Sequence, residues 1–162
     1  MADELRADGD ALALHLEREY AATADEVWSA WTDPDRLARW LAPVSGALRP
    51  GSAPVRLTFG DGDDDRADLT VLTAEAPRLL RLRWAVAGAE DSEVRVEIVP
   101  LAAGRVRLVL DHRRLGDATI GYGAGWEAYL MQLAGELGIP QGASWDELFA
   151  AALPAWRERA VG

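Results

Sequence analysis

Two histidines are the side chains in this sequence best suited to moving protons. His112 continues the alternation of an apolar strand pattern that starts at Val106, so its imidazole is expected to face the interior. Two roles remain open for it: a hydrogen-bonded residue that closes the sheet, or a polar group at the mouth of a cavity. His15 falls on the face opposite the leucines of its own segment, which predicts exposure. No G-x-S-x-G string presents a nucleophilic serine, so the pattern does not favour a hydrolytic triad.

Arg18 is the second polar side chain that the pattern directs inward, because it shares the parity of Leu16 and Tyr20. A buried guanidinium needs a carboxylate, a backbone carbonyl or a ligand as its partner. We expect a structural pairing, with a ligand contact as the alternative.

Wide aromatic side chains fall on the same predicted inner faces. Trp84, Trp126 and Tyr129 could simply pack in the core, yet their convergence on one groove favours a ligand site, because such sites are mostly apolar with a few directed polar groups. The candidate groove consists of Arg18, Leu82, Trp84, Ile98, Leu110, His112, Trp126, Tyr129 and Leu133.

Two sequence segments partly match known cofactor-binding motifs but lack residues that those motifs require. In the run that starts at Asp61, carboxylates occupy the first, third and fifth positions of a calcium loop, but Arg66 replaces the glycine and Leu72 the bidentate glutamate. We interpret it as a solvated hairpin tip. The glycines from 121 to 125 lack the third glycine of a phosphate loop and follow no parallel strand. We therefore expect no metal and no other cofactor.

The amino-acid composition argues against some classes of binding partner. The 162 residues carry 27 acidic and 17 basic side chains, a formal charge of -10, which repels the phosphate backbone of nucleic acid. No apolar run reaches the roughly 20 residues of a membrane span, and the acidic start does not resemble a secretory signal. With no cysteine present, we expect a cytoplasmic protein. Arginine without lysine, together with abundant alanine, suggests a high-GC bacterial source.

Alternating apolar residues predict a first strand from residue 11 to 20, after a flexible tail over residues 1–10. Further strands are expected at 55–59, 67–74, 79–86, 94–99 and 105–112, joined by turns short enough for an antiparallel meander. In the last three strands the alternation buries one face and leaves the other to solvent.

Helix signals frame these strands. Thr23 with Glu26 and then Asp33 with Pro34 predict two short helices after the first strand. From about residue 119 to 137 the period becomes helical, with one apolar stripe and a stop at Gly138. A final amphipathic helix is expected at 145–156, broken or kinked by Pro154. This segment, 139–162, should pack on the domain or on a dimer partner.

Four strings carry a family resemblance: ADEVWSAWTDPDRLARWLAP (24–43), PRLLRLRW (77–84), RLVLDH (107–112) and GWEAYLMQLAGEL (125–137). In this order they resemble the START-like superfamily, also called SRPBCC or Bet v-like, and within it the branch named for the activator of heat-shock-protein ATPase. The resemblance implies an α+β helix-grip fold over residues 11–138, with a curved antiparallel sheet wrapped around a long C-terminal helix.

The same resemblance leaves three functions open. The first is binding of a hydrophobic, aromatic or polyketide-like molecule in the groove, as a carrier, sensor or sequestering protein. The second is a cyclase- or aromatase-type enzyme that uses His112 or Arg18 on a polyketide-like substrate. The third is a module that activates a chaperone ATPase or contacts another protein, and it ranks last because eukaryotic activators carry an additional domain. We expect a binding protein and not an enzyme.

Overall fold

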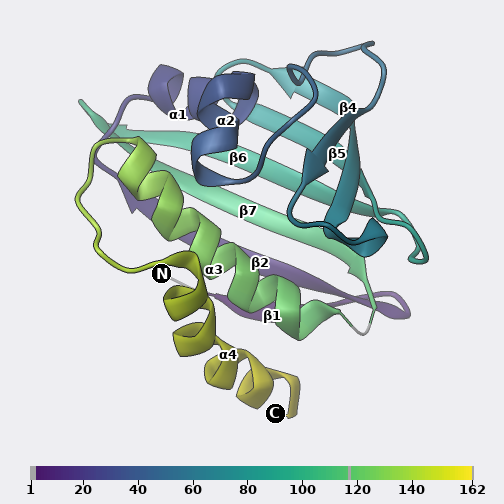
Figure 1. The fold of residues 1–162 in the computed structure, drawn as a ribbon. Helices are drawn as coiled ribbons and strands as arrows, with labels where there is room; N and C mark the ends of the chain where they lie inside the picture. The colour runs from purple at the N-terminus through teal and green to yellow at the C-terminus, as the bar shows by residue number, and fades with distance from the viewer. Residues whose placement is uncertain (1–2, 117, 162) are drawn as a thin grey trace.

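The computed structural model describes residues 3–116 and 118–161. Within these residues, seven strands form one antiparallel sheet in the order β1-β2-β7-β6-β5-β4-β3. The strands are β1 Glu4–Asp8, β2 Ala11–Tyr20, β3 Val55–Thr58, β4 Arg66–Glu75, β5 Leu79–Ala85, β6 Ser92–Ala102 and β7 Arg105–Leu115. The helices are α1 Ala24–Thr32, α2 Pro34–Trp40, the 3-10 turn η1 Asp63–Asp65, α3 Thr119–Glu136 and α4 Trp145–Val161. Figure 1 shows α1, α2 and α3 on one side of the curved sheet.

The inner face of the sheet follows the predicted alternation. In β6 and β7 the inward residues pair across the strands, as Val96 does with Leu110 and Ile98 with Leu108. These four side chains are at most 1% exposed. α3 covers this face with its own buried stripe, which includes Trp126, so the predicted α+β helix-grip arrangement is confirmed.

Local capping accounts for the two short helices. Thr23 accepts a hydrogen bond from the Glu26 amide at 3.2 Å, and Asp33 accepts from the amides of Asp35 and Arg36. Pro34 stands at the start of α2, where its missing N–H costs no hydrogen bond. The connection between the two helices is therefore a single residue.

The N-terminal residues differ from the expected tail. Glu4–Asp8 forms β1, an edge strand that pairs with β2 and places Glu4 opposite His15. Gly9 and Asp10 form the two-residue turn between these strands, with Gly9 at a φ of 63°. Residues 1 and 2 of the expected tail lie outside the described residues. Because β1 extends the sheet beside β2, His15 is 7% exposed, and the prediction that it faces solvent is wrong.

The C-terminal segment is a helix that packs along α3. α4 runs without interruption through Pro154, contrary to the expected break. The carbonyl that Pro154 leaves unpaired belongs to Ala150, which is exposed, so water can satisfy it. Trp156 is fully buried over α3. None of the helices in residues 3–116 and 118–161 is both long and apolar enough to pass through a lipid bilayer.

Candidate functional site

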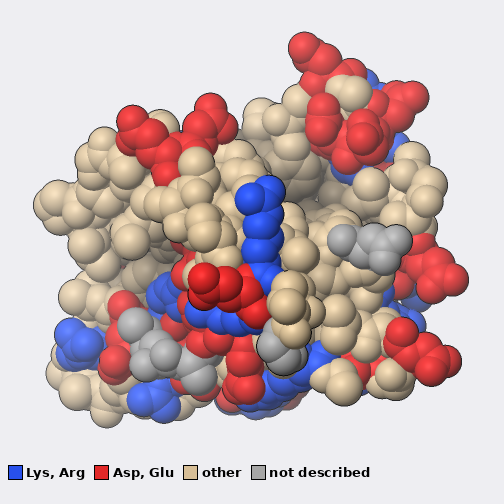
Figure 2. All heavy atoms as spheres, turned by 90° about the horizontal axis from the view of Figure 1, so that it is seen from below, with Lys and Arg blue, Asp and Glu red and all other residues tan. Residues whose placement is uncertain are grey.

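A pocket of about 490 Å³ opens between α3, α4, the end of β5 and the β3–β4 connection. Figure 2 shows a cluster of acidic side chains beside a hollow of mostly uncharged residues, with arginines also present on this face. Seven of the sixteen lining residues are aromatic, and charged residues occur only in the short segment 64–66. The pocket is lined by Leu41, Phe59, Asp64, Asp65, Arg66, Ala67, Trp84, Val86, Ala118, Gly121, Tyr122, Gly125, Trp126, Tyr129, Trp145 and Phe149.

Helical spacing brings the aromatic rings of the pocket together. Tyr122, Trp126 and Tyr129 are four and three residues apart on α3, so they share one face of the helix. Trp145 and Phe149 are four residues apart on α4 and stack at 4.9 Å with an interplanar angle of 17°. The centroid of Tyr129 lies 5.3 Å from that of Trp145, which joins the two helices into one aromatic wall.

The strand side of the wall is held by Trp84 at the end of β5. Its ring meets Trp126 at 5.7 Å in an edge arrangement, and its indole N–H donates to the Tyr122 hydroxyl at 3.2 Å. Phe59, which follows β3, lies 6.1 Å from Trp84 and 5.9 Å from Tyr129. Three separate parts of the chain thus meet around the same space.

His112 stands behind this wall and does not line the pocket. The Trp126 indole N–H donates to Nδ1 of His112 at 3.0 Å, so Nδ1 is unprotonated and the proton resides on Nε2. Nε2 then donates to the Ser92 hydroxyl at 2.8 Å, and Ser92 donates to the Trp84 carbonyl. Complete burial lowers the pKa of His112 to about 3. The imidazole is therefore neutral and has both nitrogens occupied.

The two tyrosines on α3 keep their protons at neutral pH. Burial raises the pKa of Tyr129 to about 12 and also raises that of Tyr122, where the hydrogen bond from Trp84 acts in the opposite sense. Both phenols can therefore donate a hydrogen bond within the pocket.

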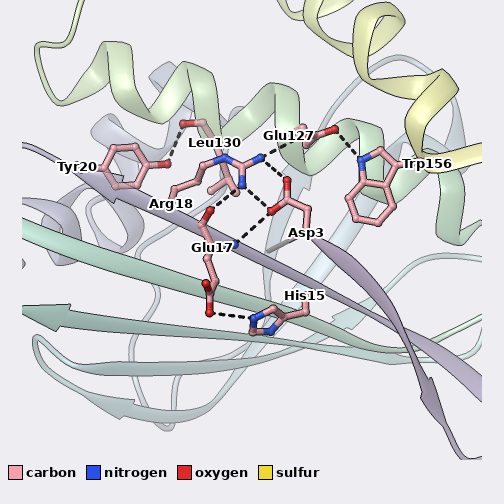
Figure 3. Close-up of polar contacts among 8 residues, drawn as sticks. All are labelled: Asp3, His15, Glu17, Arg18, Tyr20, Glu127, Leu130 and Trp156. Atoms are coloured by element: carbon pink, nitrogen blue, oxygen red, sulfur yellow. Dashed lines mark hydrogen bonds and ion pairs between the residues drawn. The ribbon is translucent and has the colours of Figure 1, made fainter. Parts of the chain in front are cut away.

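Arg18 belongs to a separate polar cluster on the other side of α3 (Figure 3). Its two terminal nitrogens donate to the two carboxylate oxygens of Asp3 at 2.7 and 2.8 Å, and one also approaches Glu127 at 3.4 Å. Glu127 in turn accepts from the Trp156 indole N–H at 2.7 Å. The cluster ties the N-terminal residues, β2, α3 and α4 together.

The pKa values of the two carboxylates in this cluster are shifted in opposite directions. Burial disfavours the charged form of Asp3, yet hydrogen bonds and the charge of Arg18 hold its pKa below the ordinary value. Burial and the neighbouring Asp3 raise the pKa of Glu127, and the bond from Trp156 opposes this. Since Asp3 already occupies the Arg18 fork, this arginine is paired structurally, as the sequence favoured.

The nine residues of the predicted groove lie in four different places. Trp84, Trp126 and Tyr129 line the pocket. Four aliphatic residues, Leu82, Ile98, Leu110 and Leu133, are at most 1% exposed and fill the core between sheet and helix. His112 lies behind the pocket, and Arg18 lies in the cluster with Asp3.

Sequence reasoning missed four aromatic members of the wall. Tyr122 was already part of the predicted apolar stripe, and Trp145 and Phe149 belonged to the predicted amphipathic segment, so their type was visible but their destination was not. Phe59 ends the predicted strand 55–59, and nothing in the alternation singled it out.

A family model for activator of Hsp90 ATPase homolog 1-like proteins matches residues 21–138. The chain belongs to this family. The match ends before α4, so two aromatic members of the pocket wall, Trp145 and Phe149, come from outside the family region. No curated protein sequence matches the chain.

Solved structures share the fold of this family member over nearly its whole length. The crystal structure of CalU16 from Micromonospora echinospora is 28% identical, with a TM-score of 0.77, and the match covers 99% of this chain and 97% of that one. A Bordetella parapertussis protein encoded by BPP1335 is 32% identical over 97% of this chain and 91% of its own, with a TM-score of 0.72.

A third structure, DynU16 from the dynemicin biosynthetic locus, is 29% identical with a TM-score of 0.68. The match covers 78% of this chain and 47% of that chain.

Proposed function

We propose that this protein binds a planar, largely apolar aromatic molecule in the pocket between α3, α4 and the sheet, as a carrier, sensor or sequestering protein. The observation that carries the proposal is an open pocket of about 490 Å³ walled by seven aromatic side chains. Its volume lies within the range of small-molecule sites, and its wall combines apolar rings with a few polar groups. The location of the DynU16 gene in a biosynthetic locus supports a role with a secondary metabolite.

Binding is favoured over a cyclase-type reaction by the placement of the two candidate catalytic groups. His112 is neutral, lies outside the pocket lining and has both ring nitrogens in hydrogen bonds. Arg18 is engaged by Asp3. A general acid or base needs to reach the substrate proton, directly or through one water. The family description makes contact with a chaperone the alternative, to be preferred if no ligand binds.

Titration with fluorene and 9-fluorenone, two planar tricyclic probes, tests the proposal. We expect saturable quenching of tryptophan emission with a dissociation constant on the order of 10 μM, and calorimetry should give a negative heat-capacity change. Phe149→Ala should weaken binding of both probes by about tenfold, because the removed ring forms part of the wall.

Leu148→Ala is the matched control, since Leu148 is the neighbouring residue of α4 and does not line the pocket. The affinity of this variant for both probes should equal that of the unmodified protein. Absence of saturable quenching with either probe would contradict the proposal, as would equal losses in the two variants.

A further inference from the structure

The polar groups on the helix side of the pocket are hydrogen-bond donors. Tyr122 and Tyr129 both line it, and they lie seven residues apart on α3, about two helical turns or 10.5 Å along the axis. The two tyrosines therefore lie at different positions along the helix side of the pocket.

The hydroxyl of Tyr122 has its direction set by a neighbour. Its oxygen accepts the Trp84 indole N–H at 3.2 Å, which occupies one lone pair and turns the O–H away from Trp84. Within the described residues this O–H has no acceptor. A donor that itself accepts a hydrogen bond is polarised, which strengthens the bond that it can give to a third group.

The hydroxyl of Tyr129 has no hydrogen-bond partner in the part of the chain that the structure describes, although the residue is half-buried between Trp126, Trp145 and Phe59. Trp145, in the same wall, carries a buried indole N–H that also lacks a partner among residues 3–116 and 118–161. Buried polar groups are normally hydrogen-bonded, and exceptions need an explanation.

Carboxylates stand at a different part of the pocket. Asp64 and Asp65 belong to the exposed η1 turn and line the pocket next to Arg66, whose guanidinium approaches the Asp63 carboxylate at 3.5 Å. The two carboxylates repel a ligand oxygen that can only accept hydrogen bonds, while the tyrosine hydroxyls attract it. The distribution of donors and acceptors thus orients a polar ligand as well as retaining it.

We propose that the pocket selects aromatic ligands that carry a carbonyl oxygen, such as aryl ketones or quinones, and that Tyr122 and Tyr129 determine this specificity by donating to that oxygen. This inference rests on the proposed binding function and adds the chemical class of the ligand. The aromatic wall supplies affinity for any planar ring system, and the two hydroxyls supply the discrimination.

The test compares 9-fluorenone with fluorene, which has nearly the same shape but no carbonyl. The unmodified protein should bind the ketone about 5- to 10-fold more tightly than the hydrocarbon, the factor typical of one net hydrogen bond. Tyr129→Phe and Tyr122→Phe are measured against both probes. At least one variant should bring the ratio of the two affinities to about one while fluorene affinity stays the same.

Tyr20→Phe is the matched control. It removes a hydroxyl that donates to the Leu130 carbonyl outside the pocket lining, and the affinity ratio should not change. Tyr129→Phe is the cleaner of the two test variants, because Tyr122→Phe also leaves the Trp84 indole N–H without its acceptor. As a second readout, the carbonyl band of bound 9-fluorenone should lie at lower wavenumber in the unmodified protein than in the responsive variant.

The results of this test distinguish a failure of the proposed specificity from a failure of the proposed binding function. Equal affinities for ketone and hydrocarbon in the unmodified protein, or an unchanged ratio in both tyrosine variants, would overturn the specificity while leaving the binding function standing. Failure of both probes to bind would overturn the binding function and the specificity together.

Discussion

Lowering the pH from 7 to 4.5 is expected to cost the protein about 3 kcal/mol of stability through His112 alone, and about 4 kcal/mol by pH 3. Burial lowers the pKa of this imidazole from its ordinary 6.5 to about 3. As the pH falls through 6.5 the unfolded chain takes up a proton that the folded protein does not. The stabilising contribution is therefore complete above pH 6.5 and is lost as the pH approaches 3.

Urea unfolding at a series of pH values measures this effect, with His112→Gln as the control. A glutamine does not titrate, so the free energy of unfolding of the variant should depend less steeply on pH across this range. Carboxylates whose pKa is lowered, such as Asp3 and Asp8, destabilise both proteins equally at low pH and cancel in the comparison. Parallel pH profiles would show that His112 is not held neutral by the fold.

Gly123→Ala is expected to lower the free energy of unfolding by about 1–2 kcal/mol. A Cβ at this position would overlap the six-membered ring of Trp156, which is fully buried and held by its bond to Glu127. Overpacking of this kind typically costs about 1–3 kcal/mol, against a helix-propensity gain of about 1 kcal/mol. Displacement of α4 should also weaken ligand binding, since α4 contributes Trp145 and Phe149 to the pocket.

Gly121→Ala is the control that distinguishes the steric overlap with Trp156 from the effect of alanine on helix propensity. Gly121 is exposed on the same helix, and an added Cβ meets no atom within 4 Å, so this variant should be neutral or stabilised by up to about 1 kcal/mol. Thermal or urea unfolding measures both variants. If Gly123→Ala proved as stable as Gly121→Ala, the close packing of α4 on α3 would be refuted.

Much of the fold follows from local patterns in the sequence. The alternation in β5, β6 and β7 specified which face is buried, because a shift of one residue would move every side chain to the other face. Capping residues located α1 and α2, and the change to a helical period located α3. These signals depend on neighbours within a few positions along the chain, which is why they can be read without a structure.

The errors concern features that depend on how one segment packs against another. β1 forms because it pairs with β2, and the burial of His15 follows from that strand and from contacts with Asp111 and Glu17. Alternation alone could not distinguish an outer face exposed to water from one covered by neighbouring side chains. The Gly9-Asp10 pair, which forms the turn, was the available signal for a hairpin.

The candidate site was predicted only in part for the same reason. Trp84, Trp126 and Tyr129 could be assigned to inner faces from periodicity, but the aliphatic residues on those faces are buried in the core and do not line the pocket. The pocket exists where α4 folds back on α3, and the position of α4 depends on the burial of Trp156 more than 30 residues after Gly123. No local pattern encodes that contact.

The most direct test of ligand binding in this pocket is a titration of the 15N-labelled protein with 9-fluorenone, followed by NMR at individual amides. The backbone amides of Gly121 and Gly125, which line the pocket, should shift saturably, together with the indole N–H signals of Trp84 and Trp145. Gly9 and Gly104, in hairpin turns outside the lining, should remain in place. Saturable shifts at Gly9 or Gly104 without shifts at Gly121 and Gly125, or no shifts at all, would contradict the account.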